Sequence, residues 1–215
     1  AVKRAAEMLA KAERPLIIAG NGAYWGLAEA GLKRLARDHG IPVFAKALGR
    51  GLVPEDMEIG FSWALAHPAV KEADVVMVAG GRMGMSIGYG APPLFARDAR
   101  FIQIELDAAE IGRNRPVDVG VLGDCALSLA AIANELSRRH NRPPDPGWVT
   151  DALAERLQRI DEVGLDEDGM VHPLRMAREL AARLPEDSVF VGDGANCLSY
   201  FRCILKVKGP GAWMD

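Results

Sequence analysis

The stretch DVVMVAGG, residues 74–81, decides which fold this sequence predicts. Its apolar residues follow one another without alternation, and two glycines end the run. A strand that is apolar on both faces must be covered on both sides, as is typical of central strands in parallel sheets. Helices then lie on both faces of the sheet, so the stretch predicts an α/β protein.

Similar stretches occur on both sides of this run along the chain. The segment between the first two predicted strands, LAEAGLKRLARDHG, has Ala28, Leu32 and Leu35 on one face and Gly40 as its stop, which predicts a helix. Strands that alternate with helices predict a parallel, doubly wound, Rossmann-like sheet. The predicted strands are residues 15–20, 42–48, 74–80, 100–106 and 117–123.

A proline-rich segment, NRPPDPG (141–147), predicts a linker after this domain. A polar helix to about Val163 and a GLDEDG loop follow. A new unit then reads as helix HPLRMARELAARLP, strand SVFVGDG and helix ANCLSYFRCIL. We therefore expect a first domain over residues 1–140, a linker over 141–170 and an incomplete second α/β domain over 171–215. A start at Ala1 without an initiator Met predicts a segment of a longer protein.

Composition excludes several classes of partner. The 215 residues are 49% hydrophobic with a formal net charge of −3, which suffices for one full domain and part of another. Without runs of Lys or Arg, we expect no nucleic-acid partner. The apolar runs are too short to span a bilayer, and we expect no membrane partner and no signal peptide. The 3 cysteines form no CxxC, which favours a reducing, cytoplasmic setting.

Glycines follow three of the predicted strands, in GNGAYW, GGRMG and GDGAN. Such turns let backbone N–H groups approach a phosphate closely, but they also supply the backbone freedom of tight turns. None matches GxGxxG, and each alone is explained as well by packing. Together they lie at the carboxyl ends of parallel strands, where open α/β sheets bind ligands. Arg82 adds a cation suited to a phosphate or carboxylate.

Two carboxylates stand where a predicted strand stops, in FIQIELDAAEIGRN (101–114). Asp107 with Glu110 three residues later has the spacing of a helix-capping box. Carboxylates at this strand end could equally accept hydrogen bonds from the hydroxyls of a ribose. We assign capping to Asp107 and favour a ligand contact for Glu105.

Five motifs in order resemble the central domain of thiamine-diphosphate-dependent enzymes, most of all acetolactate synthase and its benzaldehyde-lyase-like and oxalyl-CoA-decarboxylase-like relatives. The resemblance covers roughly the first 140 residues, and the remainder resembles the start of that family's diphosphate-binding domain. The motifs are PLIIAGNGA, GIPVFAKALGRGLVPEDM, ADVVMVAGGRM, FIQIELDAAEIGRN and VDVGVLGD.

The resemblance implies a nucleotide site, for FAD or ADP, in the first domain. Where flavin-binding synthases carry an Arg-Phe-Asp-Asp-Arg-like run, this chain has RMGMSIGYG (82–90), which is similar to the flavin-free, lyase-like branch. FAD, ADP and an empty, purely architectural domain thus stay open. The residues implied for the nucleotide are Gly20, Gly22, Ala23, Gly80, Arg82, Glu105, Asp107 and Asp124.

For the second domain, the resemblance implies that Gly194, Ala195 and Asn196 contact the phosphates of thiamine diphosphate. The preceding Gly192-Asp193-Gly194 looks like the start of the family's magnesium motif, yet it follows the domain's first strand. We therefore expect the Mg²⁺ ligands and the catalytic glutamate outside this chain, and we assign no catalytic or metal-binding residue within it.

The activity implied for the full-length protein is that of a carboligase or decarboxylase acting on 2-keto acids, as a homodimer or homotetramer. The alternatives are a nucleotide-binding module of an oxalyl-CoA-decarboxylase-like enzyme and an architectural domain. By itself, the 215-residue chain is expected to be inactive and to bind thiamine diphosphate weakly.

Overall fold

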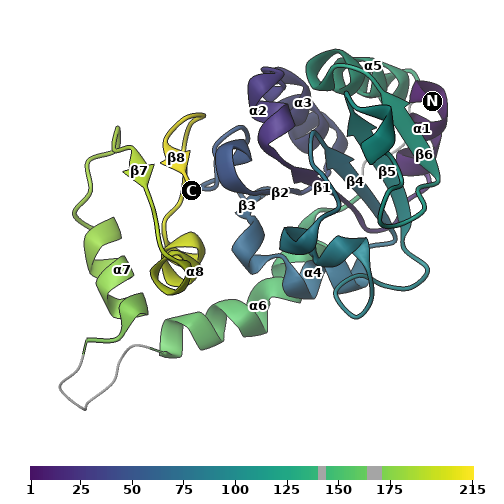
Figure 1. The fold of residues 1–215 in the computed structure, drawn as a ribbon. Helices are drawn as coiled ribbons and strands as arrows, with labels where there is room; N and C mark the ends of the chain where they lie inside the picture. Colours follow the sequence, from purple (N-terminus) through teal and green to yellow (C-terminus); the bar gives the residue numbers. More distant parts are fainter. Residues whose placement is uncertain (140–143, 164–170) are drawn as a thin grey trace.

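A parallel sheet of six strands forms the centre of the first domain in the computed structural model, which describes residues 1–139, 144–163 and 171–215 (Figure 1). Its order, β3-β2-β1-β4-β5-β6, reverses direction between β1 and β4, as in doubly wound nucleotide-binding folds. The predicted fold class is confirmed. The strands are β1 (Pro15–Ala19), β2 (Val43–Ala45), β3 (Gly60–Ser62), β4 (Val75–Ala79), β5 (Arg100–Glu105) and β6 (Val119–Leu122).

The edge strand β3 was not predicted from the sequence. It has three residues, begins with a glycine and pairs only with β2, where Phe44 lies opposite Phe61. Strand β2 is shorter than predicted because η1 (Ala47–Gly49) turns the chain. Neither feature has the length over which a period of two becomes visible.

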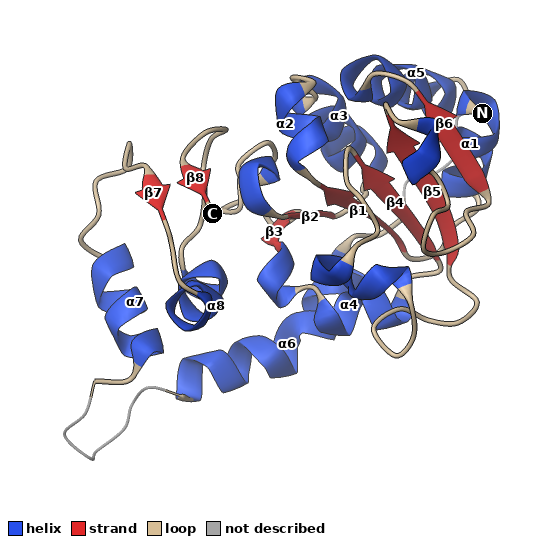
Figure 2. Cartoon of the chain, in the orientation of Figure 1, coloured by secondary structure: helices blue, strands red, loops and turns tan. Residues whose placement is uncertain are grey.

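Helices cover both faces of this sheet (Figure 2). On β4, Val75, Met77 and Ala79 point into one core, and Val76 and Val78 point into the other. The run at 74–81 is therefore buried on both faces, as predicted. Helices α1 (Val2–Ala10), α2 (Asn21–Trp25), α3 (Glu29–His39) and α5 (Cys125–Ser137) lie on the first face, and α4 (His67–Glu72) and α6 (Gly147–Glu162) lie on the second.

Four short 3-10 helices complete the connections of the first domain. The second of them, η2, carries Trp63 on the same side as α4, and the third, η3, contributes Ile87 to the same core. They are η1, η2 (Trp63–Leu65), η3 (Met85–Gly90) and η4 (Ala108–Glu110).

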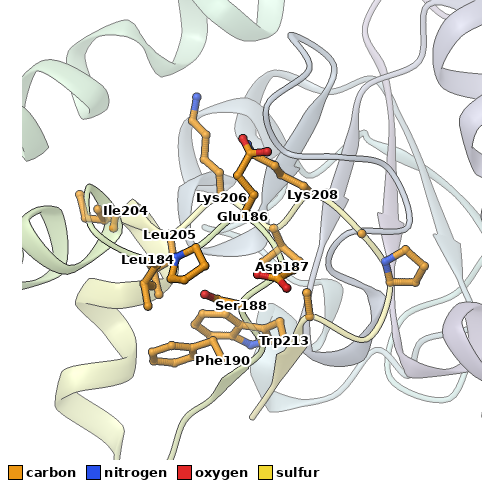
Figure 3. A pocket seen from close by; sticks show the side chains of 16 residues that line it. Leu184, Glu186, Asp187, Ser188, Phe190, Ile204, Leu205, Lys206, Lys208 and Trp213 are labelled. Carbon is orange, nitrogen blue, oxygen red and sulfur yellow. The ribbon is translucent and has the colours of Figure 1, made fainter.

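The C-terminal unit builds a small sheet of its own. Strands β7 (Phe190–Val191) and β8 (Trp213–Met214) pair in parallel, and helices α7 (Pro173–Ala181) and α8 (Ala195–Ile204) pack against each other in the same unit. The rings of Phe190 and Trp213 stack with centroids 4.6 Å apart and line a cavity of about 560 Å³ (Figure 3). Strand β8 was not predicted. The predicted GLDEDG loop and residues 140–143 lie outside the described residues, and the domain boundaries stay a prediction.

A buried ion pair joins the C-terminal unit to the first domain. Arg50 donates to both carboxylate oxygens of Glu55 at 2.8 and 2.6 Å, and both side chains are almost completely buried. Arg50 also donates to the carbonyl of Leu205 at 2.6 Å, and its guanidinium lies 4.0 Å from the ring centroid of Trp213. Glu55 exchanges two hydrogen bonds with the backbone of Val207. The pair thus fixes residues 205–213 against the loop after β2.

Removing one member of this pair should destabilise the protein more than removing both. Arg50→Met leaves the Glu55 carboxylate buried without its counter-charge, which costs about 3–5 kcal/mol, and Glu55→Gln strands the guanidinium similarly. The double variant should recover part of this loss. Urea unfolding measures the free energies, and limited proteolysis near residues 205–209 reports release of the C-terminal unit. Additive losses in the double variant would contradict this account.

Candidate functional site

The point where the strand order reverses brings together the glycine turns after β1 and β4. The N–H of Gly20 donates to Ala79 O at 3.1 Å, and the N–H of Gly22 donates to Gly80 O at 2.8 Å. Gly80 has a φ of +59°, and a Cβ added to it would lie 2.2 Å from the nitrogen of Ala23. The structure therefore places the predicted residues of both turns in direct contact.

Four backbone donors of these turns, those of Gly20, Gly22, Ala23 and Gly80, are already engaged within the protein. Besides Gly20 and Gly22, Ala23 donates to Gly20 O at 3.1 Å, and Gly80 donates to Ile104 O at 3.1 Å. A phosphate could use these N–H groups only at the expense of the bonds that hold the turns together. Close packing of two backbones is thus sufficient reason for these glycines.

The acidic residues lie along the same edge of the sheet. Glu105 ends β5, and its carbonyl accepts the N–H of Gly123, so that the turn carrying Asp124 lies beside it. Asp124 caps α5 by accepting the N–H of Leu127 at 2.8 Å. Within the described residues, the carboxylate of the half-buried Glu105 accepts a hydrogen bond only from the N–H of its neighbour Leu106. Glu105 therefore keeps acceptor capacity for a hydroxyl group.

Asp107 has the capping role assigned to it, although the helix is a single 3-10 turn. Its carboxylate accepts the N–H of Ala109 at 2.9 Å at the start of η4. Glu110 does not complete a capping box; it is buried and pairs with Arg113 at 2.7 Å. The exposed side chain of Arg82 places its Nε 3.7 Å from Oε1 of Glu110. It is thus partly neutralised and still exposed to an anion.

The carboxylates of Glu105 and Asp124 both influence Cys125, the first residue of α5. Burial, together with the charges of Asp124 and Glu105, raises the pKa of its thiol to about 12. This shift reports that the two carboxylates face one buried side chain. They form a negative pair at the carboxyl ends of β5 and β6.

Exposed apolar side chains surround these carboxylates, and the sequence reasoning missed them. Leu106 directly follows Glu105, and Leu122 is the last residue of β6. Leu127 lies in the first turn of α5. Trp25 and Leu27, after β1, are also largely exposed. In the sequence, the available signal for this exposed surface was an apolar residue at the last position of a strand, where it does not follow the apolar pattern of that strand. Such a surface can cover a flat ring while the carboxylates bind hydroxyls.

The second predicted site is separate from this edge. Gly194, with a φ of +97°, caps α8, whose first residues are Ala195 and Asn196. The side chain of Asp193 accepts the N–H of Gly194 at 2.7 Å. Gly194, Asn196 and Cys197 are exposed, so the amino end of α8 is open to an anion. Within the part of the chain that the structure describes, no cluster of His, Cys, Asp or Glu side chains could hold a metal ion.

Comparison with known proteins agrees with the fold and identifies its family. The family described as "Thiamine pyrophosphate enzyme, central domain" matches residues 2–132, and the chain belongs to this family of thiamine-pyrophosphate (thiamine-diphosphate) enzymes. The resemblance drawn from the sequence motifs is confirmed.

Several relatives match the whole chain. It is 35% identical to a probable acetolactate synthase of Mycobacterium bovis and to the acetolactate synthase large subunit IlvG of Mycobacterium tuberculosis. It is 30% identical to oxalyl-CoA decarboxylase of Escherichia coli. Each match covers 100% of this chain and 38% of the relative, so the chain spans well under half the length of these enzymes. None of the described helices is both long and apolar enough to cross a membrane.

Gly80→Ala should destabilise the first domain strongly. The added Cβ meets the backbone of Ala23 and forces a left-handed conformation on alanine, which together cost about 2–5 kcal/mol. Gly84→Ala is the matched control, because no atom lies within 4 Å of its added Cβ. Equal urea midpoints for the two variants would refute the packing role of Gly80.

The buried thiol of Cys125 should resist alkylation. With a pKa of about 12, its thiolate fraction at pH 8 is roughly 10⁻⁴, whereas Cys197 is exposed. Iodoacetamide treatment followed by peptide mass spectrometry should find Cys197 modified and Cys125 unmodified. Because the pKa is raised, reactivity at Cys125 should grow as pH rises toward 12. Equal labelling of both at pH 8 would show that the edge near Glu105 is open.

Proposed function

We propose that the protein containing this chain is a thiamine-diphosphate-dependent carboligase or decarboxylase acting on 2-keto acids, similar to acetolactate synthase. The observation that carries the proposal is 35% identity to acetolactate synthases along the whole chain, across both units. The family match covers the first domain alone. The identity across α7, β7 and α8 therefore supports the assignment of the C-terminal unit as well.

The diphosphate is assigned to the turn of Gly194, Ala195 and Asn196. The amino end of α8 supports this assignment, because the N–H groups of a first helical turn attract anions; the N–H of Gly194 itself is engaged by Asp193. When bound, thiamine diphosphate supplies stabilisation of a carbanion, which the protein itself cannot provide. The residues of this chain bind and orient the phosphates. Magnesium ligands and the catalytic glutamate are assigned to segments outside the 215 residues.

A nucleotide, FAD or ADP, is a second proposed ligand, at the edge of the six-stranded sheet. The pair Glu105 and Asp124 suits ribose hydroxyls, Arg82 suits a phosphate, and the exposed apolar side chains suit a flat ring. The engaged N–H groups of the glycine turns disfavour a tight phosphate cradle at Gly20–Ala23. The cytoplasmic setting, supported by three free cysteines, and a homodimer or homotetramer belong to the same proposal.

The activity test compares the 215-residue chain with the protein extended to the length of its relatives. We expect the extended protein to form acetolactate from pyruvate only with thiamine diphosphate and Mg²⁺, and the short chain to be inactive. Asn196→Ala in the extended protein should raise the cofactor concentration needed for half-maximal activity several-fold. Gln158→Ala, which removes an exposed amide on α6, is the control.

Cofactor-independent turnover, or an unchanged cofactor requirement in Asn196→Ala, would refute the assigned roles. A visible absorption spectrum of the purified extended protein separates bound flavin from ADP or an empty edge. Acetolactate formation without any flavin absorbance would leave the activity standing and remove FAD from the proposal.

A further inference from the structure

A cavity of about 550 Å³ lies between the first domain and α8. Its walls come from the carboxyl ends of β2 and β3, from η3, from α6 and from α8. Trp63 contributes an aromatic wall, and its indole N–H is held by the carbonyl of Ser86 at 3.0 Å. This volume lies within the range of pockets for small organic ligands, roughly 300–1,000 Å³.

Positive charge dominates the walls of this cavity. Lys46, Arg156 and Arg202 come from three different elements, and Asp215 is the lining carboxylate. Arg202 lies 2.6 Å from Asp215 and neutralises it. Neither Lys46 nor Arg156 forms an ion pair with any residue that the structure describes. Three cationic side chains against one carboxylate leave a net charge of about +2.

The two unpaired cations are only partly satisfied by hydrogen bonds. Lys46 donates to the hydroxyl of Ser86, and Arg156 donates to the carbonyl of Ala64 at 2.6 Å. The buried Nε of Arg156 has no hydrogen-bond partner among the described residues. Burial lowers the pKa of Lys46, and the charge of Asp215 only partly opposes this effect. A desolvated cation without a counter-ion is costly, so an anion in this cavity would be bound favourably.

His67, which also lines the cavity, does not change the net charge of its walls. Burial lowers the pKa of its imidazole below the ordinary value, and the charges of Arg156 and Lys71 lower it further. The ring is therefore neutral at pH 7 and can accept or donate one hydrogen bond.

We propose that this cavity binds the phosphate group of a small organic ligand, with Lys46, Arg156 and Arg202 as its donors. A phosphate dianion matches the net charge, whereas a single carboxylate would leave one cation uncompensated. The site goes beyond the proposed activity, since 2-keto acids carry no phosphate. Its cationic donors also differ from the residues assigned to the diphosphate: Arg202 lies eight residues from Gly194, or about 12 Å along α8, whereas Ser199 on the cavity wall lies one turn from Asn196.

Calorimetric titration of the 215-residue chain with inorganic phosphate tests this proposal. We expect saturable binding at pH 7.5 that weakens with added salt. Lys46→Met should raise the dissociation constant at least tenfold, and Lys46→Arg should restore much of the affinity. Lys11→Met removes a cation from the exposed end of α1 and should leave phosphate binding unchanged. Circular dichroism melting verifies that each variant is folded.

A second readout uses the unsubstituted protein. Phosphate should shift the NMR signal of the Trp63 indole N–H, assigned by its loss in Trp63→Phe, while acetate at equal concentration should shift it much less. No heat of phosphate binding, no indole shift, or equal affinity for acetate would overturn the proposal. Phosphate binding that persists in Lys46→Met but disappears in Asn196→Ala would also overturn it, and would assign the anion to the start of α8. Failure of this site leaves the acetolactate assay unaffected, so the two proposals can fail separately.

Discussion

Burial of β1 and β4 on both faces is the constraint from which the arrangement of the first domain follows. Every residue of these strands is buried, and all except Pro15 lie in one of two cores on opposite sides of the sheet. Helices must therefore cover both faces, and successive crossovers must run outward from the centre in both directions. The strand order consequently reverses between β1 and β4, and the turns that follow them meet at one edge. The candidate nucleotide edge is a by-product of this topology.

The same constraint limits what the glycine turns can do. Two turns that leave adjacent central strands must pass each other closely, and their backbones are in contact. This contact engages the N–H groups of Gly20, Gly22, Ala23 and Gly80, which a phosphate could otherwise use. The side chains beyond β5 and β6, where carboxylates lie among exposed leucines, offer further groups for ligand recognition. Glycine after a strand is thus weaker support for a phosphate site than the identity of the side chains around it.

The sequence was sufficient for the elements that carry a clear apolar pattern. Strands β1, β2, β4, β5 and β6 were predicted from short apolar runs, and helix α3 was predicted from apolar residues on one helix face. Strands β3 and β8 are too short for a period to be visible, and they exist through pairing with a neighbour. The ion pair of Arg50 and Glu55 also escaped prediction. Two charged residues five positions apart in a loop are expected to be exposed to solvent. Here a segment distant in the sequence covers both of them.

The interaction between that pair and the C-terminal unit has a consequence for how the protein can vary. Residues 50 and 55 form hydrogen bonds with backbone atoms of a segment some 150 positions later, and Arg50 also lies over the ring of Trp213. Substitutions at Leu205 or Val207 therefore leave these bonds intact, and insertions between α6 and α7 need not disturb them. The arrangement of the two units is encoded locally in the loop after β2. Chimaeras between relatives should tolerate a crossover in residues 141–170 as long as both halves retain the backbone path at 205–207 and the Arg–Glu pair.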